Sequence, residues 1–261
     1  MKAASLALGV ALLAQAALAG TEITVETRQA DAAPDAKPRE SRLAIEGRSL
    51  HAETTGGRHS LVYRGEGGVL EVYDHREKTV FRLDRATARS AARGVESARE
   101  AMEALPEPQR SALESALGME REVDSVTLRE TGRGDRVADV ACRLLELRQG
   151  AVRRAEICEA PPGAAGVSAE ALATVRELVA FASDVVDLLP AAVGAAGLAA
   201  LAGAEKIDGV PLRVRAWPSD APASETRIVR AVPRAYPPER FQPPPDYRPG
   251  LGIQIGPDAA R

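Results

Sequence analysis

Hydrophobic and polar residues alternate along the first third of the chain, a pattern typical of strands that expose one face. Short polar or glycine-containing stretches, such as Gly56-Gly57 and the residues 75–78, separate these segments and indicate turns. The pattern predicts a meander of antiparallel strands. The expected strands cover residues 21–28, 41–52, 59–64, 69–74 and 79–84.

The hydrophobic period changes to that of a helix after residue 92. Apolar residues at helical spacing predict one helix over residues 93–105 and a shorter one over 109–117, separated by Pro106 and Pro108. Alternation then returns over residues 123–130 and predicts another strand. The next residues, Gly132-Arg133-Gly134-Asp135, indicate a turn.

The strongest amphipathic pattern covers Leu172 to Leu189, with Ser168 placed as its N-cap. The uncharged residues 191–204 predict a buried helix or a packed loop, with a lid that touches lipid as the alternative. This run is too short and too rich in glycine for a transmembrane helix. Further along, Pro211 indicates a sheet edge or a bulge. The remaining expected segments are strands over residues 207–217 and 226–232 and an extended, proline-dense stretch over 233–249.

Cys142 and Cys158 flank a segment with the pattern of a β-hairpin, in which Gly150 supplies the positive φ of a tight turn. A three-residue loop at Gln149-Gly150-Ala151 sets the register of the two strands. The residues expected to oppose each other are Arg148 with Val152, Glu146 with Arg154, and Cys142 with Cys158. Directly opposed Cβ atoms are about 4.5–5.5 Å apart, which a disulfide can bridge after local adjustment.

We therefore predict a structural disulfide between Cys142 and Cys158, the only cysteines in the chain. A two-residue loop would place the two sulfurs on opposite faces, so the three-residue loop is preferred. Redox-active or metal-binding cysteines are the less favoured alternatives, because the spacing fits neither C-x-x-C chemistry nor a zinc site. Closing a loop of about 15 residues is worth roughly 3 kcal/mol in the chain-entropy treatment.

The N-terminus has the layout of a signal peptide over residues 1–19. Met1-Lys2 is positive, residues 3–16 are apolar, and Ala17-Leu18-Ala19 is a cleavage site, so cleavage is expected after Ala19. A membrane anchor is the weaker interpretation, because the apolar run is short and ends in small residues. Export to the periplasm or the medium agrees with the expected disulfide, since both imply an oxidising compartment.

The composition excludes some partners. The chain has 261 residues and a formal net charge of -3, so nothing in its charge favours nucleic acid. Aromatic residues make up 3% of the chain, which is too few for platforms on which bases stack. This length suits one ordinary domain with additions, or two small ones.

The candidate reactive residues predict solvated side chains rather than an active site. The histidines, His51, His59 and His75, have no carboxylate or cysteine at metal-ligand spacing beside them, so solvated strand histidines are expected. The glycine-rich residues 65–68 precede a strand instead of a helix, which argues against a phosphate-binding loop. Two small basic spots, Arg153-Arg154 and Arg133 with Arg136, are expected to be solvated faces. No catalytic, cofactor-binding or metal-binding residue is predicted.

The order of elements and several short motifs resemble the exported bacterial family known as domain of unknown function 4412, which is similar to the periplasmic lipoprotein carrier LolA and its acceptor LolB. The motifs are VLEVYDHREKTVFRLD, the cysteine hairpin with Gly150 at its tip, Gly209-Val210-Pro211, and FQPPPDY at residues 241–247. The last is similar to a family ending F-x-x-P-x-G-Y, with Asp246 in place of glycine.

The resemblance implies an α+β fold in which an antiparallel curved sheet forms an incomplete barrel, with helices packed on its concave face. It implies one domain over residues 20–247, followed by a loose tail over 248–261. It supplies no catalytic residue and no cofactor.

The leading functional hypothesis is a non-enzymatic binding or carrier module for an apolar ligand, with a lipid acyl chain or a lipoprotein as the partner. The alternative is a structural or interaction protein of the cell envelope that docks on a partner protein through its proline-rich C-terminal tail. An enzyme is the third and weakest hypothesis, because no reactive constellation stands out.

Overall fold

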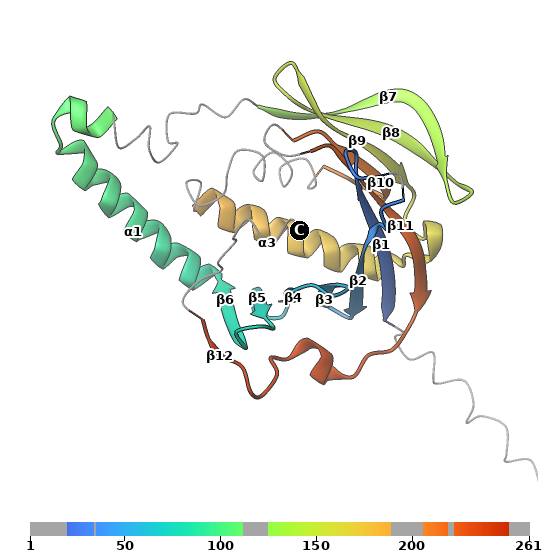
Figure 1. The fold of residues 1–261 in the computed structure, drawn as a ribbon, viewed down its shortest axis with the longest axis horizontal. Helices are drawn as coiled ribbons and strands as arrows, with labels where there is room; N and C mark the ends of the chain where they lie inside the picture. Colours follow the sequence, from blue (N-terminus) through green and yellow to red (C-terminus); the bar gives the residue numbers. More distant parts are fainter. Residues whose placement is uncertain (1–19, 34, 112–124, 189–205, 219–221, 251–261) are drawn as a thin grey trace, which may run out of the picture.

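The computed structural model describes residues 20–250 apart from residues 34, 112–124, 189–205 and 219–221, and its main feature is a sheet of twelve strands arranged around one helix (Figure 1). The first six strands are β1 (Thr21–Gln29), β2 (Arg39–Glu46), β3 (Ser49–Thr54), β4 (His59–Arg64), β5 (Val69–Asp74) and β6 (Thr79–Asp84). The others are β7 (Val126–Val137), β8 (Val140–Gln149), β9 (Val152–Ala160), β10 (Val210–Ala216), β11 (Ser224–Pro233) and β12 (Arg248–Pro249).

The spatial order of the strands is β12-β6-β5-β4-β3-β2-β1-β11-β10-β9-β8-β7. Neighbours run antiparallel except β12 and β6, which are parallel. The sheet ends at β12 on one side and at β7 on the other, so it is not closed. The expected antiparallel, curved and incomplete barrel is therefore confirmed.

One expected strand, over residues 41–52, is a hairpin of two strands. Gly47 has a φ of 52° and turns the chain between β2 and β3, where Ile45 pairs with Leu50. Glycine adopts this left-handed conformation without steric cost. The larger apolar residues lie at Leu43 and Ile45 before the turn and shift by one position to Leu50 and Ala52 after it, and this shift marks the turn that the single expected strand missed.

The helix α3 (Ala169–Leu188) lies inside the curve of the sheet (Figure 1). Its buried apolar residues belong to the same core cluster as Ile45, Leu50 and Tyr63 of the sheet; they are Ala171, Leu172, Phe181 and Val185. The centroids of the Phe181 and Tyr63 rings lie 5.7 Å apart. Side chains therefore fill the space between this helix and β2–β4, so the expected helix on the concave face completes the core there.

Ser168 caps α3 as the sequence predicts, because its Oγ accepts a hydrogen bond from the backbone N–H of Ala171 at 3.1 Å. The helix is also tied to the β2–β3 turn. The hydroxyl of Thr174 donates to the carbonyl oxygen of Gly47 at 2.7 Å, and Arg48 forms an ion pair with Glu177. These contacts fix the helix against the rim of the sheet.

The helix α1 (Arg85–Glu103) starts earlier than the residue 93 expected from the sequence. Asp84 caps it by accepting a hydrogen bond from Thr87 N–H at 2.8 Å, and an Arg85–Asp184 ion pair of 2.8 Å joins it to α3. Among its described side chains Ala88 is the one that is buried. Figure 1 shows α1 leading away from the sheet, so it does not pack along the concave face.

The turn expected at residues 132–135 lies further along the chain. Gly132 and Gly134 belong to β7, and the chain turns at Ala138 and Asp139, whose φ angles are 46° and 64°. The register of β7 against β8 shifts between Glu130 and Gly134. The glycines therefore accommodate an irregularity within a strand, a role that glycine often has in sheets.

The C-terminal strap, residues 233–250, packs against the strands β3–β6. Its short helix η3 (Pro238–Phe241) buries Phe241 in a cluster with Val62 and Tyr73. The carbonyl oxygen of Phe241 accepts a hydrogen bond from Arg64 at 2.9 Å. At the end of the strap β12 pairs with β6, directly beyond the expected domain boundary at residue 247.

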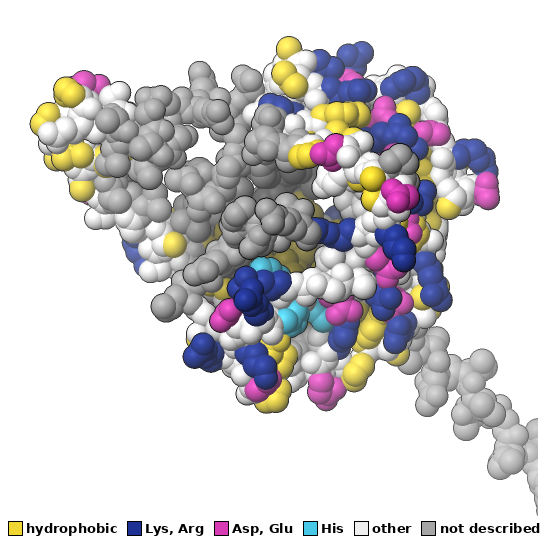
Figure 2. Space-filling view, viewed as in Figure 1, with side chains coloured by type: hydrophobic (Ala, Val, Ile, Leu, Met, Phe, Trp, Pro, Cys, Tyr) yellow, Lys and Arg dark blue, Asp and Glu magenta, His cyan; other side chains and the backbone are white. Residues whose placement is uncertain are grey.

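Ion pairs cross from strand to strand on the outside of the sheet. Figure 2 shows Lys and Arg side chains mixed with Asp and Glu over the upper right part of the molecule, where β7–β11 lie in Figure 1. Arg227 on β11 pairs with Glu26 on β1 at 2.9 Å, and Arg215 on β10 pairs with Glu225 on β11 at 2.7 Å. Such cross-strand pairs help to fix the register of neighbouring strands.

Several expected features lie outside the described residues. They are the signal peptide over residues 1–19, residues 112–117 of the shorter helix, the uncharged residues 191–204 and the tail over residues 251–261. Within the part of the chain that the structure describes, no helix is both long enough and apolar enough to span a membrane.

Candidate functional site

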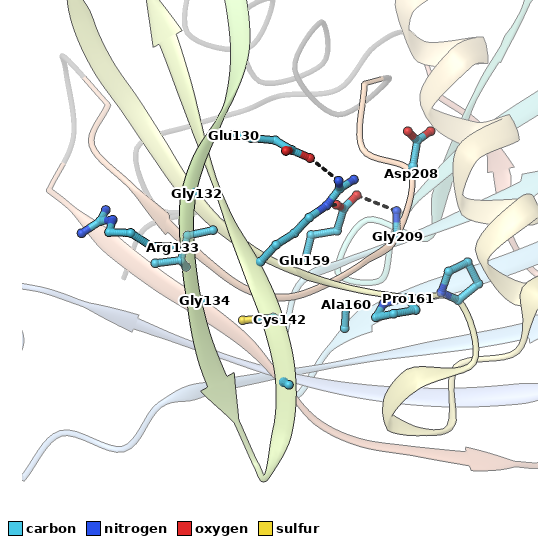
Figure 3. A pocket seen from close by; sticks show the side chains of 14 residues that line it. Glu130, Gly132, Arg133, Gly134, Cys142, Glu159, Ala160, Pro161, Asp208 and Gly209 are labelled. Carbon is cyan, nitrogen blue, oxygen red and sulfur yellow. Dashed lines mark hydrogen bonds and ion pairs between the residues drawn. The ribbon is translucent and has the colours of Figure 1, made fainter.

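A pocket of about 700 Å³ opens beside the hairpin of β8 and β9 (Figure 3). The strands β7 and β8, the end of β9 and the loop that enters β10 form its walls. Its apolar lining consists of Ala141, Cys142, Leu144, Ala160, Pro161 and Pro162. The volume falls within the range of about 300–1,000 Å³ that is typical of small-molecule sites.

A disulfide between Cys142 and Cys158 braces one wall of the pocket, as predicted from the sequence. The Cα atoms of the two cysteines lie 5.4 Å apart. Both residues are buried, and they belong to the same core cluster as the α3 residues Leu172 and Phe181. The disulfide therefore connects the hairpin covalently at a point where it also contributes to the core.

The predicted register of this hairpin is wrong. Gln149 pairs with Val152, so the loop has the two residues Gly150 and Ala151. A bulge then leaves Arg154 without a partner residue on β8. Before the bulge Arg148 faces Arg153 instead of Val152, and beyond it Glu146 faces Glu156 instead of Arg154 and Leu144 faces Cys158.

The bulge explains how a two-residue loop is compatible with the disulfide. Without it, the two-residue loop would place Cys142 and Cys158 on opposite faces of the hairpin. The extra residue, Arg154, restores the common face, and the two cysteines bond diagonally across the strands. The sequence alone does not reveal a bulge at this position.

A charged network forms the polar side of the pocket. Arg143 donates from its Nε to Glu159 at 2.5 Å, and its Nη1 forms an ion pair with Glu130 (Figure 3). The Glu159 side chain is 2% exposed, whereas that of Glu130 is 64% exposed. The hydrogen bond from Arg143 to Glu159 keeps the pKa of Arg143 above its usual value.

Glu159 also fixes the loop that enters β10. Its Oε1 accepts a hydrogen bond from the backbone N–H of Gly209 at 2.6 Å. A Cβ atom on Gly209 would overlap the carbonyl oxygen of Ala160 and lie 2.7 Å from Glu159 Cγ. This close approach requires glycine, and it accounts for the Gly209-Val210-Pro211 motif at the start of β10.

Pro211 itself lies at a bulge. The register of β10 against β9 shifts between Pro211 and Arg213, which confirms one of the two interpretations suggested by the proline.

The structure places the three histidines outside this pocket. His51 is buried at 8% exposure, so the expectation that it is solvated is wrong. The side chain of His59 is 30% exposed and lies 3.4 Å from Asp74, and His75 bonds to the Tyr247 hydroxyl at 2.7 Å. The C-terminal strap, whose position the sequence does not reveal, covers His51.

The two basic spots found in the sequence meet in the structure. Arg133 and Arg153 both approach the carboxylate of Glu156, at 3.5 Å and 3.9 Å. Within the described part of the chain, no group of three or more His, Cys, Asp or Glu side chains is arranged to hold a metal ion.

Comparisons with known proteins give similarity to solved structures alone. No protein-family model matches the chain, and no curated protein does. An uncharacterized conserved protein from Thermus thermophilus is 11% identical, with a TM-score of 0.44, over 90% of this chain and 91% of that one. A LolA superfamily protein from Nitrosomonas europaea is 9% identical, with a TM-score of 0.33, over 87% and 91% of the two chains.

Neither similarity carries information about a ligand or an activity. The resemblance to domain of unknown function 4412 stays a prediction. The disulfide is consistent with a protein that functions outside the cytoplasm.

Proposed function

We propose that this protein is an exported, non-enzymatic binding or carrier module for an apolar ligand, such as the acyl chain of a lipid or lipoprotein. The observation that carries the proposal is the 700 Å³ pocket beside the hairpin of β8 and β9. Its position, its lining and its rigid frame each support this function.

The position of the pocket gives an apolar chain direct access to the hydrophobic core. Leu144 and Ala160 line the pocket and also belong to the core cluster that contains Phe181. A ligand in the pocket would therefore contact the same apolar surface that packs around α3. Burial of apolar area contributes about 25 cal/mol per Å², so even part of an acyl chain gains several kcal/mol from such contacts.

The charged residues of the pocket support binding rather than catalysis. Glu159, its buried carboxylate, is already engaged by Arg143 and by the backbone N–H of Gly209. A carboxylate bound on both sides in this way holds two segments together, which suits a fixed frame around a ligand. The exposed Glu130 forms an ion pair with Arg143 at the open side of this frame.

The filled space beneath α3 determines where the ligand would sit. Phe181 and Tyr63 are each 1% exposed and pack against one another, so the ligand would lie beside the helix.

An interaction role for the proline-rich tail is the weaker proposal. The strap residues Tyr236, Phe241 and Tyr247 already make contacts within the chain, through Glu22, Arg64 and His75. A partner protein would have to compete with these contacts.

A titration with a fluorescent fatty acid tests the proposed function. The Ala141→Trp variant fills the pocket from an exposed position in its wall, and we expect it to abolish saturable binding. The matched control is Ala151→Trp, which places the same side chain at the exposed tip of the hairpin, away from the pocket. Equal binding by both variants, or no saturable binding by the unmodified protein, would overturn the proposal.

A further inference from the structure

Four guanidinium groups surround one carboxylate on the strands β7, β9 and β10. We call this group the arginine cluster; it consists of Arg133, Arg153, Arg213 and Arg215 around Glu156. Their nitrogens lie 3.5, 3.9, 3.9 and 3.5 Å from the Glu156 oxygens. The Glu156 side chain is 11% exposed, so it forms the floor of the cluster.

Two of the four arginines have closer partners elsewhere. Arg213 donates to Asp135 at 2.6 Å, and Arg215 donates to Glu225 at 2.7 Å. These two arginines are therefore part of the cross-strand ion pairs of the sheet. Their contacts with Glu156 are secondary.

Arg133 and Arg153 are in a different position. Within the described residues, the nearest carboxylate oxygens that they approach are those of Glu156 and, for Arg153, also Glu146 at 3.9 Å. Charge-assisted hydrogen bonds between guanidinium and carboxylate are about 2.7–2.9 Å long, so these contacts lack close pairing. The two side chains are 63% and 43% exposed, which leaves their donors accessible to a ligand.

The indole of Trp217 fixes the guanidinium of Arg153. The Arg153 Cζ atom lies 4.1 Å from the centroid of the indole, which is a cation–π contact. A guanidinium held flat on an aromatic ring loses less freedom when it binds a planar or tetrahedral anion. The cluster thus contains a preorganised donor, Arg153, and a more exposed donor, Arg133, and both approach the carboxylate of Glu156.

The cluster adjoins the pocket, because Arg133 also belongs to the pocket lining. In Figure 3 the Arg133 side chain points away from the Arg143, Glu159 and Glu130 network, on the other side of the β7–β8 ribbon. In Figure 2 the region of β7–β11 carries many Lys and Arg side chains. An anion bound to the cluster would not need the pocket to be occupied.

We propose that the arginine cluster is a binding site for a phosphate group, with Arg133 and Arg153 as its principal donors. A phosphate offers three or more acceptor oxygens, which can approach both guanidiniums more closely than the recessed Glu156 carboxylate does. The same chemistry occurs in a lipid headgroup and in free inorganic phosphate. The site shares Arg133 with the pocket wall, but phosphate binding at the cluster does not depend on the apolar-ligand function proposed above.

The role of Glu156 separates this proposal from a purely structural one. If the cluster only stabilises the sheet, Glu156 is its necessary centre, and replacing Glu156 weakens the ion pairs that hold the surrounding arginines. If the cluster binds phosphate, Glu156 repels the ligand, because both carry negative charge. Removing this charge should then strengthen binding.

Trp217 is the only tryptophan in the chain, so its fluorescence reports directly on the cluster. We expect sodium phosphate to change this fluorescence in a saturable way that sodium chloride of equal ionic strength does not reproduce. The double variant Arg133→Gln/Arg153→Gln should bind phosphate at least about tenfold more weakly. The Glu156→Gln variant should bind it about fivefold more tightly, as expected from removing one nearby like charge screened by the dielectric constant of bulk water.

Two further measurements complete the test. Arg89→Gln, which changes an exposed arginine on α1, is the matched control and should bind like the unmodified protein. Cosedimentation with phosphatidylglycerol vesicles, compared with phosphatidylcholine vesicles, distinguishes the two sources. Binding to the anionic vesicles that needs Arg133 and Arg153 identifies a lipid headgroup, and a response to inorganic phosphate alone identifies free phosphate.

Three results would overturn the proposal. The first is that neither phosphate nor phosphatidylglycerol produces a saturable response. The second is equal binding by the Arg133→Gln/Arg153→Gln variant and the Arg89→Gln control. The third is weaker binding by Glu156→Gln while its circular dichroism spectrum matches that of the unmodified protein.

Discussion

Replacing His51 with leucine is expected to remove a loss of stability that the protein suffers in acid. His51 lies on β3 between Ala44 and Val62 of the neighbouring strands, and it is 8% exposed. Within the described residues, neither of its buried ring nitrogens has a hydrogen-bond partner. The protonated ring would therefore have neither water nor a hydrogen-bond acceptor to stabilise it.

The surroundings of His51 lower its pKa from 6.5 to about 4. Burial is the largest cause, the positive charge of Arg240 on the strap is the next, and His75 acts in the same direction. Glu53, on the same strand as His51, opposes them with its negative charge. The neutral form of His51 is thus favoured in the folded protein.

The sign and size of the effect follow from this pKa. The unfolded chain takes up a proton at His51 near pH 6.5, whereas the folded protein does not do so until the pH approaches about 4. The stability that depends on neutral His51 is therefore fully present above pH 6.5 and is lost as the pH falls toward 4. At about 1.36 kcal/mol per pH unit, the pKa difference corresponds to a loss of about 3 kcal/mol in the free energy of unfolding.

Urea denaturation of the unmodified protein and of His51→Leu, each at pH 7 and pH 4, tests this reasoning. Other groups also titrate in this range, so the informative quantity is the difference between the two proteins. We expect His51→Leu to lose about 3 kcal/mol less than the unmodified protein between the two pH values. His59→Leu, at a partly exposed site, is the control and should retain the acid loss. Equal losses in the unmodified protein and His51→Leu would refute the reasoning.

Three other changes test the frame of the pocket and the strap. Gly209→Ala should destabilise the protein by at least about 2 kcal/mol, because the added Cβ atom overlaps the β9 backbone. Its control, Gly94→Ala on α1, has open space around it and should stabilise the protein by about 1 kcal/mol. Thermal unfolding distinguishes the two variants. Replacing Cys142 and Cys158 together by alanine should cost about 3 kcal/mol, and equal melting temperatures of the variant and the unmodified protein without reductant would contradict this. Glu71→Ala should cost about 3 kcal/mol of stability and speed proteolysis of the strap. The substitution leaves the partly buried Arg64, which binds both Glu71 and the strap, without its carboxylate partner. An unchanged cleavage rate would count against this role.

The strands were predictable where the alternation of side chains is regular and glycines mark the turns. Thr79–Asp84 and its partner Val69–Asp74 lie where the sequence places them, because one face of each meets the core. The single strand expected over residues 41–52 missed the turn at Gly47, where the apolar positions shift from Leu43 and Ile45 to Leu50 and Ala52. The prediction also failed at Ala138 and Asp139, because alanine in the left-handed region is not a recognisable turn signal.

The pocket was less predictable than the strands. The disulfide follows from two cysteines on opposite arms of a hairpin, yet its register depends on a bulge at Arg154 that no local pattern signals. Glu159 pairs with Arg143, 16 residues away, because the two oppose each other in the bulged hairpin register, whereas its bond to Gly209, 50 residues away, follows from tertiary packing. Burial of His51 likewise arises from the distant C-terminal strap.

Photocrosslinking with a diazirine-bearing fatty acid, followed by peptide mapping, tests the central proposal most directly, because it reports where the ligand lies. Our account predicts labelling of residues in the pocket wall, at 141–144 or 160–162, and loss of this labelling in Ala141→Trp but not in Ala151→Trp. Labelling confined to α1 or to the C-terminal strap, or unchanged labelling in Ala141→Trp, would contradict it.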